Sequence, residues 1–258
     1  MVSDEDAPGW QKDPLIREID YPTCFASLDD AKDHVESIFG NQVTLFHQTA
    51  ALYPLTDDEF AETQAQQDAL VSALDCSRAA LDAFVARHEE HSNPEDEASV
   101  KLLRLYHLYL GIRMSVGILQ EDTRELAFDQ FEPQFESMLS YCNDLLENGE
   151  TLRPSCSSGL GVVIPLHMIG HRCRNPLIRS EAVELLLKAS RREGLWDSSV
   201  VGRIAATTSS LEQETEMLAQ WRVREVKTQF IDDHRARLTF VSGDASSIQR
   251  RYYREIDW

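Results

Sequence analysis

Two histidines and a cysteine lie close together in the second half of the sequence. His167 and His171 are four residues apart, and Cys173 follows directly behind them. On a helix, this spacing places both imidazole rings on one face, as zinc ligands can be. A complete zinc site needs further ligands, and the neighbouring sequence offers no obvious third or fourth one. Packed or polar histidines beside a buried cysteine account for the same residues, so we expect no metal and no cofactor in this chain.

Cys173 is a second candidate for chemistry, as a nucleophile. Arg172 and Arg174 flank it, and they would lower the pKa of its thiol if they pointed the same way. A free cysteine at a helix end with apolar neighbours is more often part of the core. The sequence also contains no glycine-rich phosphate loop, Gly-x-Ser-x-Gly elbow or carboxylate metal motif. We therefore expect no catalytic residues and a protein that is not an enzyme.

A ligand pocket is the third kind of site that the residue types allow. Polar and aromatic side chains recur on residues 95–114, a stretch that is apolar on most faces, and such groups can line a pocket that holds a small molecule. The alternative is that their polar ends reach the surface or a single partner. The candidate pocket residues are Tyr106, His107, Arg113, His167 and His171.

The elements that must position these residues are predicted to be mostly helices. Apolar residues recur at helical spacing in seven stretches, and short connections between them predict antiparallel hairpins in a stacked array. The stretch around Tyr106 is apolar on most faces, so we expect it to be the central helix. The predicted helices cover residues 27–48, 56–90, 95–114, 128–146, 162–172, 175–194 and 197–218.

The pattern changes after Trp221. Residues 223–230 and 235–241 alternate around a short polar turn, which predicts a small C-terminal β-hairpin. Residues 252–258 add either a third strand or an extended tail. The predicted organisation is an extended lead-in over residues 1–24, a helical domain over 25–221, and the β-hairpin with its tail over 222–258.

Composition narrows the classes of function. The chain has 258 residues, of which 42% are hydrophobic and 27% charged, with no apolar run long enough to span a membrane. Residues 1–150 hold 31 Asp and Glu against 9 Lys and Arg, a net charge of −22. Residues 151–258 hold 13 against 16, a net charge of +3. Because the acidic half would repel a phosphate backbone, we expect no direct binding of nucleic acid. The lack of a long apolar run leads us to expect no membrane partner.

One stretch has an unusual order of residues, which local structure explains. Asn175 can cap a helix that starts at Pro176, and Asp197 can cap the next one. Gly194 is predicted to end the first of these helices, and Trp196 to anchor the corner in the core. Arg179 is expected to pair with a carboxylate such as Glu181 or a more distant one. The motif residues are Pro165, Leu166, Cys173, Arg174, Pro176, Arg179, Glu193, Gly194, Trp196 and Asp197.

This motif resembles the helical middle and C-terminal region of fungal transcription factors that carry an N-terminal zinc binuclear (Zn2Cys6) cluster. The resemblance spans Phe25 to Trp258 and is most specific from Pro165 to Asp197. It implies a nuclear regulatory domain, with a cytoplasmic pool, that senses a small-molecule effector, forms a homodimer or contacts a coregulator protein. The family's six-cysteine DNA reader is missing, since the N-terminal residues contain only Cys24. Zinc is therefore expected only in that absent cluster, and the chain is either a C-terminal fragment or a cluster-less paralogue.

Two alternatives belong to other classes of protein. The same helical fold could serve as a stand-alone metabolite-binding protein or as an enzyme of a biosynthetic pathway. It could also be a scaffold that pairs with another regulator. A pocket with converging polar side chains would favour a ligand, whereas a flat apolar patch would favour pairing.

Overall fold

The computed structural model describes residues 19–52, 55–88, 93–117, 124–147, 159–217, 222–243 and 249–258. The predicted fold class is confirmed: these residues form a mostly helical protein with a small antiparallel sheet at the C-terminus. Most of the predicted lead-in, residues 1–18, lies outside the described residues. None of the helices in the described ranges is long and apolar enough to cross a membrane.

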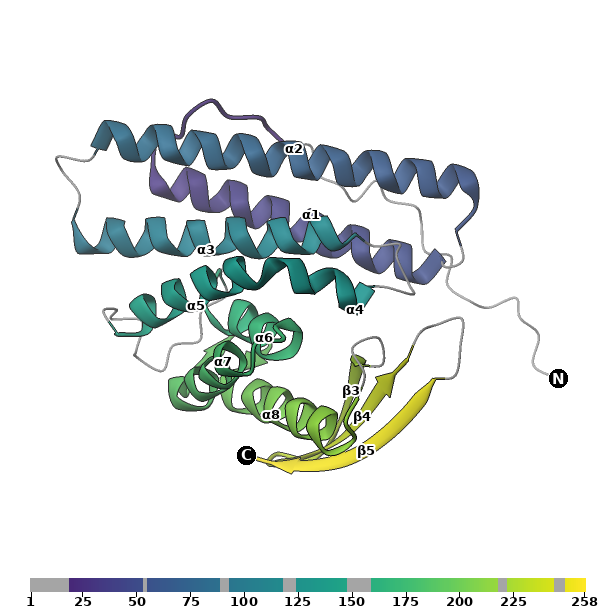
Figure 1. The fold of residues 1–258 in the computed structure, drawn as a ribbon. Helices are drawn as coiled ribbons and strands as arrows, with labels where there is room; N and C mark the ends of the chain where they lie inside the picture. Colours follow the sequence, from purple (N-terminus) through teal and green to yellow (C-terminus); the bar gives the residue numbers. More distant parts are fainter. Residues whose placement is uncertain are drawn as a thin grey trace.

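Three long helices form the first layer of the molecule (Figure 1): α1 (Leu28–Leu52), α2 (Asp57–His88) and α3 (Pro94–Val116). Each runs antiparallel to the one before it, as expected for stacked hairpins. α3 packs against both α1 and α2 on one side and against a later helix on the other. It therefore occupies the centre of the core, as its apolar sequence predicts.

Local side chains fix where these helices begin. The hydroxyl of Ser27 accepts the N–H of Asp30 at 3.1 Å. Thr56 and Glu59 exchange side chain to backbone hydrogen bonds, which makes a capping box at the start of α2. The side chain of Asn93 accepts the N–H of Asp96 at 2.8 Å. Each cap satisfies an amide that the first helical turn leaves without a partner.

The second layer is built from shorter helices. α4 (Arg124–Ala127), the 3₁₀ turn η2 (Phe128–Phe131) and α5 (Glu132–Glu147) run along α3. Below them lie α6 (Val163–Arg172), α7 (Pro176–Ala189) and α8 (Ser198–Glu214), which pack on one another. A two-residue hairpin, β1 (Arg192–Glu193) and β2 (Trp196–Asp197), joins α7 to α8.

The C-terminal residues form three strands and not two: β3 (Val223–Asp232), β4 (Arg235–Ser242) and β5 (Arg250–Asp257). They pair antiparallel in the order β3-β4-β5, so the last segment is a third strand. The buried face of the sheet packs against the end of α8 around Leu211, Leu238 and Phe240. This second, smaller core attaches the sheet to α8.

Two parts of the motif differ from the sequence prediction. α7 ends at Ala189, where Ser190 takes the left-handed conformation (φ 44°), so Gly194 does not end this helix. Gly194 instead lies in the turn between β1 and β2, where its φ of 58° suits a glycine. Trp196 is 38% exposed and is not a core anchor, because it lies on the same face of the hairpin as its cross-strand partner Glu193, and Glu193 is the buried member of this pair. The predicted caps at Asn175 and Asp197 are confirmed.

Candidate functional site

A cavity of about 330 Å³ lies where α1, α3, the start of α6 and the β1–β2 hairpin meet. Its wall combines aromatic and aliphatic side chains with two carboxylates. Trp196 and Leu195, which is 93% exposed, extend from the wall to the solvent. The side chains that matter most to its chemistry are Glu36, Phe39, Tyr106, Ile164, Glu193 and Trp196.

Glu193 is the structural carboxylate of this wall. It is 4% exposed, and its two oxygens accept the backbone N–H groups of Val162 and Val163 at 3.1 and 2.8 Å. The N-cap residue Val162 has no side chain that can accept these N–H groups. Glu193, about thirty positions later in the chain, therefore caps α6. Arg191 neutralises the charge, with its Nε 2.9 Å from a Glu193 oxygen. This carboxylate is therefore fully used by the fold.

Gly161 makes this cap geometrically feasible. A Cβ atom at position 161 would lie 2.1 Å from the carboxyl carbon of Glu193, which is far inside van der Waals contact. Only a glycine lets the buried carboxylate come this close to the chain before α6. The N–H of Gly161 is satisfied from the other side, by the hydroxyl of Tyr106 at 3.1 Å.

Tyr106 joins the central helix to the cavity. Its side chain is 1% exposed, and burial raises the pKa of its hydroxyl, so it stays neutral at any physiological pH. Its ring meets that of Phe39 edge to face, with 6.0 Å between centroids. This pair gives the inner wall of the cavity a rigid aromatic surface.

Glu36 is the second carboxylate of the cavity wall, and its situation differs from that of Glu193. Its Oε1 atom is buried and has no hydrogen-bond partner among the described residues. A buried carboxylate oxygen without a partner destabilises the fold, because it has lost its hydrogen bonds to water and no protein donor replaces them. Glu36 is thus the polar group of the wall that the described fold leaves available.

The other predicted pocket residues do not converge on this cavity. His107 points to α2, where its Nε2 lies 3.0 Å from the Ser77 hydroxyl. Burial, with a contribution from the charge of Arg78, lowers the pKa of His107 to about 4. Arg113 lies farther along α3, donating to the Tyr109 hydroxyl at 3.2 Å and stacking over the Phe46 ring. Of the five predicted residues, Tyr106 is the one that lines the cavity.

His167 and His171 do share one face of α6, as their spacing predicts. Their rings stack with 5.6 Å between centroids, and the ring of His167 lies 5.5 Å from that of Trp196. Burial lowers the pKa of His167 to about 4, and burial together with Arg172 lowers that of His171 well below its usual value. Within the described ranges, no three His, Cys, Asp or Glu side chains are grouped as metal ligands. The two histidines therefore lie outside the cavity wall, with the ring of His167 packed against Trp196.

Cys173 is buried in the core, and burial raises the pKa of its thiol. The two flanking arginines do not activate it, because both are engaged elsewhere. Arg172 pairs with Glu125, and Arg174 pairs with Asp129 at 2.5 Å. The geometry therefore favours a core role for this cysteine.

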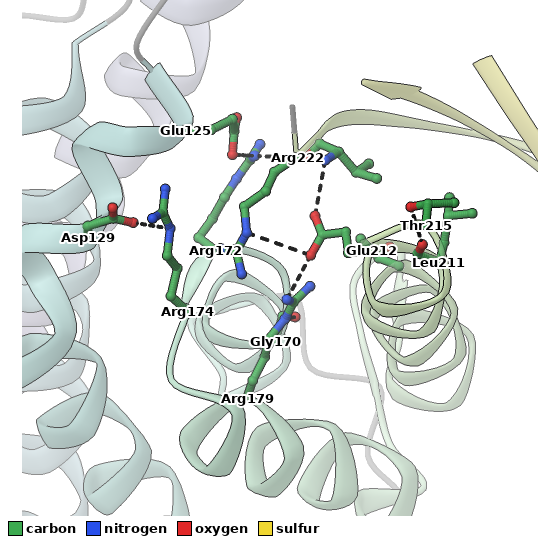
Figure 2. A network of polar contacts seen from close by, with 12 residues as sticks. Glu125, Asp129, Gly170, Arg172, Arg174, Arg179, Leu211, Glu212, Thr215 and Arg222 are labelled. Carbon is green, nitrogen blue, oxygen red and sulfur yellow. Dashed lines mark hydrogen bonds and ion pairs between the residues drawn. The ribbon is translucent and has the colours of Figure 1, made fainter. Parts of the chain in front are cut away.

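A polar network connects α6, α7 and α8 to the sheet (Figure 2). Arg179, which is 6% exposed, donates to the carbonyl of Gly170 at 2.9 Å and to Glu212 at 2.8 Å. Glu212 in turn accepts the N–H of Val223 at 3.0 Å, at the first residue of β3. The predicted partner of Arg179 was a carboxylate such as Glu181 or one farther away, and it is the farther one. The motif arginines therefore hold the layers together.

Comparison of the chain with models of protein families, with curated proteins and with solved structures found no match.

Sequence reasoning missed Glu36, Phe39 and Glu212. Glu36 and Phe39 lie on α1, far along the chain from the other residues of the cavity wall, and nothing in their local pattern marks them as site residues. The glycines at 159 and 161 were the available signal. Their lack of side chains lets the chain pass close to Glu36 and Glu193.

Proposed function

We propose that this chain is the regulatory domain of a fungal transcription factor of the zinc binuclear cluster class. It works by binding a small-molecule effector in the cavity between α1, α3 and the β1–β2 hairpin. On this proposal the domain is not catalytic, acts in the nucleus with a cytoplasmic pool, and leaves DNA recognition to a separate zinc-bearing module.

The observation that supports this proposal is the position of the cavity. Its wall comes from α1, α3, α6 and the hairpin, which are far apart in the sequence. A ligand bound there contacts all of them at once, so it stabilises one arrangement of these elements over others. The volume falls at the lower end of the roughly 300–1,000 Å³ of small-molecule sites.

The motif that carries the family resemblance also contributes to this wall. Glu193, Gly194 and Trp196 belong to the motif and line the cavity. Glu193 fixes the start of α6, while the exposed part of Trp196 borders solvent. Three of the ten motif residues therefore lie where a ligand would bind, and the others lie outside the cavity wall.

The positions of the candidate catalytic groups support a non-catalytic domain over a biosynthetic enzyme. His107 is held against Ser77 and away from the cavity, and the thiol of Cys173 has a raised pKa. General acid–base catalysis needs a proton donor and acceptor that both reach the bound molecule. A stand-alone metabolite-binding protein would use the same cavity, so it remains the alternative that an experiment must separate.

A tethering assay separates them. The chain is fused to an unrelated DNA-binding domain without regulatory activity, and a reporter gene is measured in fungal cells supplied with a metabolite library. We expect at least one compound to change the reporter several-fold through the fusion. The variant Ile164→Phe, which fills part of the cavity, should abolish this response.

Leu177→Phe is the matched control, because it adds the same ring at a side chain that is 78% exposed on α7. It should respond like the original chain. A reporter level equal to that of the DNA-binding domain alone, with every compound and with all three fusions, would contradict a regulatory function.

A further inference from the structure

The proposed function leaves the chemistry of the effector open, and the inference that follows rests on it. We infer that the cavity selects a small organic ammonium ion, with its charge paired to Glu36 and its alkyl groups against the rings of Phe39, Tyr106 and Trp196.

Glu36 brings an unpaired carboxylate to the cavity wall. Oε1 of Glu36 is buried at the cavity wall and accepts no hydrogen bond from any described residue. A carboxylate in this position is stabilised by a cation or by a strong N–H donor, and destabilised by an anion. The group that completes the site should therefore bring positive charge.

The wall of the cavity also contains aromatic rings. Phe39, Tyr106 and Trp196 all line the cavity, and the Phe39 and Tyr106 rings are fixed at right angles to each other. Aromatic faces attract alkylated ammonium ions, which combine a diffuse positive charge with an apolar surface. A compact metal cation would gain little from these rings, because it keeps its charge hydrated. The combination favours an organic cation.

The part of the chain that carries α1 and α3 is strongly acidic. Two basic side chains lie near the cavity, and one of them, Arg191, is committed to Glu193. The other, Lys32, lies one turn before Glu36 on α1, and its Nζ would be 3.4 Å from a Cβ atom at Gly159, yet it forms no ion pair with Glu36 among the described side chains. Residues 1–150, which carry α1 and α3, have a net charge of −22. This field attracts cations to the cavity and repels anions.

The test uses a matched pair of probes: choline and 3,3-dimethylbutan-1-ol, which replaces the charged nitrogen by carbon. Calorimetric titration of the purified chain should give a saturable isotherm for choline, at an affinity roughly ten-fold or more above that of the alcohol. Because both probes have the same shape, the difference reports the charge alone.

Two variants assign the binding to this cavity. Glu36→Gln keeps the shape and removes the charge, and it should weaken choline binding roughly ten- to a hundred-fold. Trp196→Leu should weaken it roughly three- to thirty-fold. Glu136→Gln, at an exposed position on α5 outside the cavity, is the matched control and should bind choline normally. Circular dichroism checks that each variant is folded.

The outcomes separate this inference from the proposed function. Equal affinity for choline and the alcohol, or full choline binding by folded Glu36→Gln, would overturn the inference. The proposed function stands in that case if Ile164→Phe still abolishes binding of a neutral or anionic compound. If no compound of any charge binds in a way that Ile164→Phe prevents, both fail.

Discussion

At the scale of single residues, the two carboxylates of the cavity show how burial and partners divide structural from functional groups. Glu193 has every oxygen in use: it accepts two backbone N–H groups at the start of α6 and pairs with Arg191. Glu36 has a buried oxygen that no described residue satisfies. The first should therefore matter for stability, and the second for binding.

Replacing Glu193 by alanine should destabilise the fold by about 3–5 kcal/mol, because it leaves the buried Arg191 charge and two helix N–H groups without a partner. Glu193→Gln should cost about 1–3 kcal/mol, since the amide oxygen still accepts one of these bonds. Urea unfolding followed by circular dichroism measures both. A loss below 1 kcal/mol for Glu193→Ala would show that the cap is not needed.

His107 gives the fold a defined dependence on pH. Its pKa is lowered from 6.5 to about 4 in the folded chain, so below pH 6.5 the unfolded chain binds a proton that the folded one does not. Stability is therefore complete above pH 6.5 and decreases as the pH falls towards 4. Between pH 7.5 and pH 5 this histidine should account for a loss of about 2 kcal/mol.

The comparison with His107→Gln isolates this effect, because glutamine can still hydrogen bond to Ser77 but does not titrate. The unfolding free energy of the variant should fall less steeply between the two pH values, although His167 and His171 contribute in the same direction. Identical pH profiles for the two proteins would refute the assignment.

At the scale of elements, the caps at helix starts could be predicted from the sequence, and partners distant along the chain could not. Ser27, Thr56, Asn93 and Asp197 satisfy the amides that follow them within a few residues, so local sequence suffices. The β1–β2 hairpin has two residues in each strand, which is too short for a periodic pattern. For this reason Gly194 was predicted to end a helix, and it belongs to a turn.

Arg179 and Glu212 join α7 to α8 and, through Val223, to the sheet. Arg179→Met should destabilise the chain by about 3–5 kcal/mol, because it leaves a buried carboxylate without its closest cation. Adding Glu212→Gln should recover part of this loss, because glutamine is neutral and can still accept the Val223 N–H. Denaturant unfolding gives the energies, and hydrogen exchange of β3 reports the sheet.

Strictly additive losses for the two substitutions would contradict a direct pairing of Arg179 with Glu212, since contacting residues should couple. Faster exchange confined to α1 and α2, with β3 unchanged, would also contradict the proposed connection. Lys188, whose exposed partner Glu184 lies on the same helix, offers a control: Lys188→Met should cost below about 1 kcal/mol.

At the scale of the whole molecule, the cavity lies where the layer of long helices meets the start of α6 and the β1–β2 hairpin. The fold class and the hairpin arrangement follow from periodicity. The cavity does not, because its walls come from residues 36 to 196 and meet only when both layers are assembled. Tyr106 was foreseen because it is a polar group on the helix expected at the centre of the core, whereas Glu36 had no comparable signal.

The central claim is that a small molecule binds in this cavity, and the melting temperature tests it most directly. The purified chain and Ile164→Phe are heated with each member of a metabolite library that includes organic amines. We predict that at least one compound raises the melting temperature of the chain, with a stabilisation of about 2.7 kcal/mol at a hundred times its Kd. The same compound should leave Ile164→Phe unchanged. If both proteins respond identically to every compound, the cavity is not a binding site and the account is wrong.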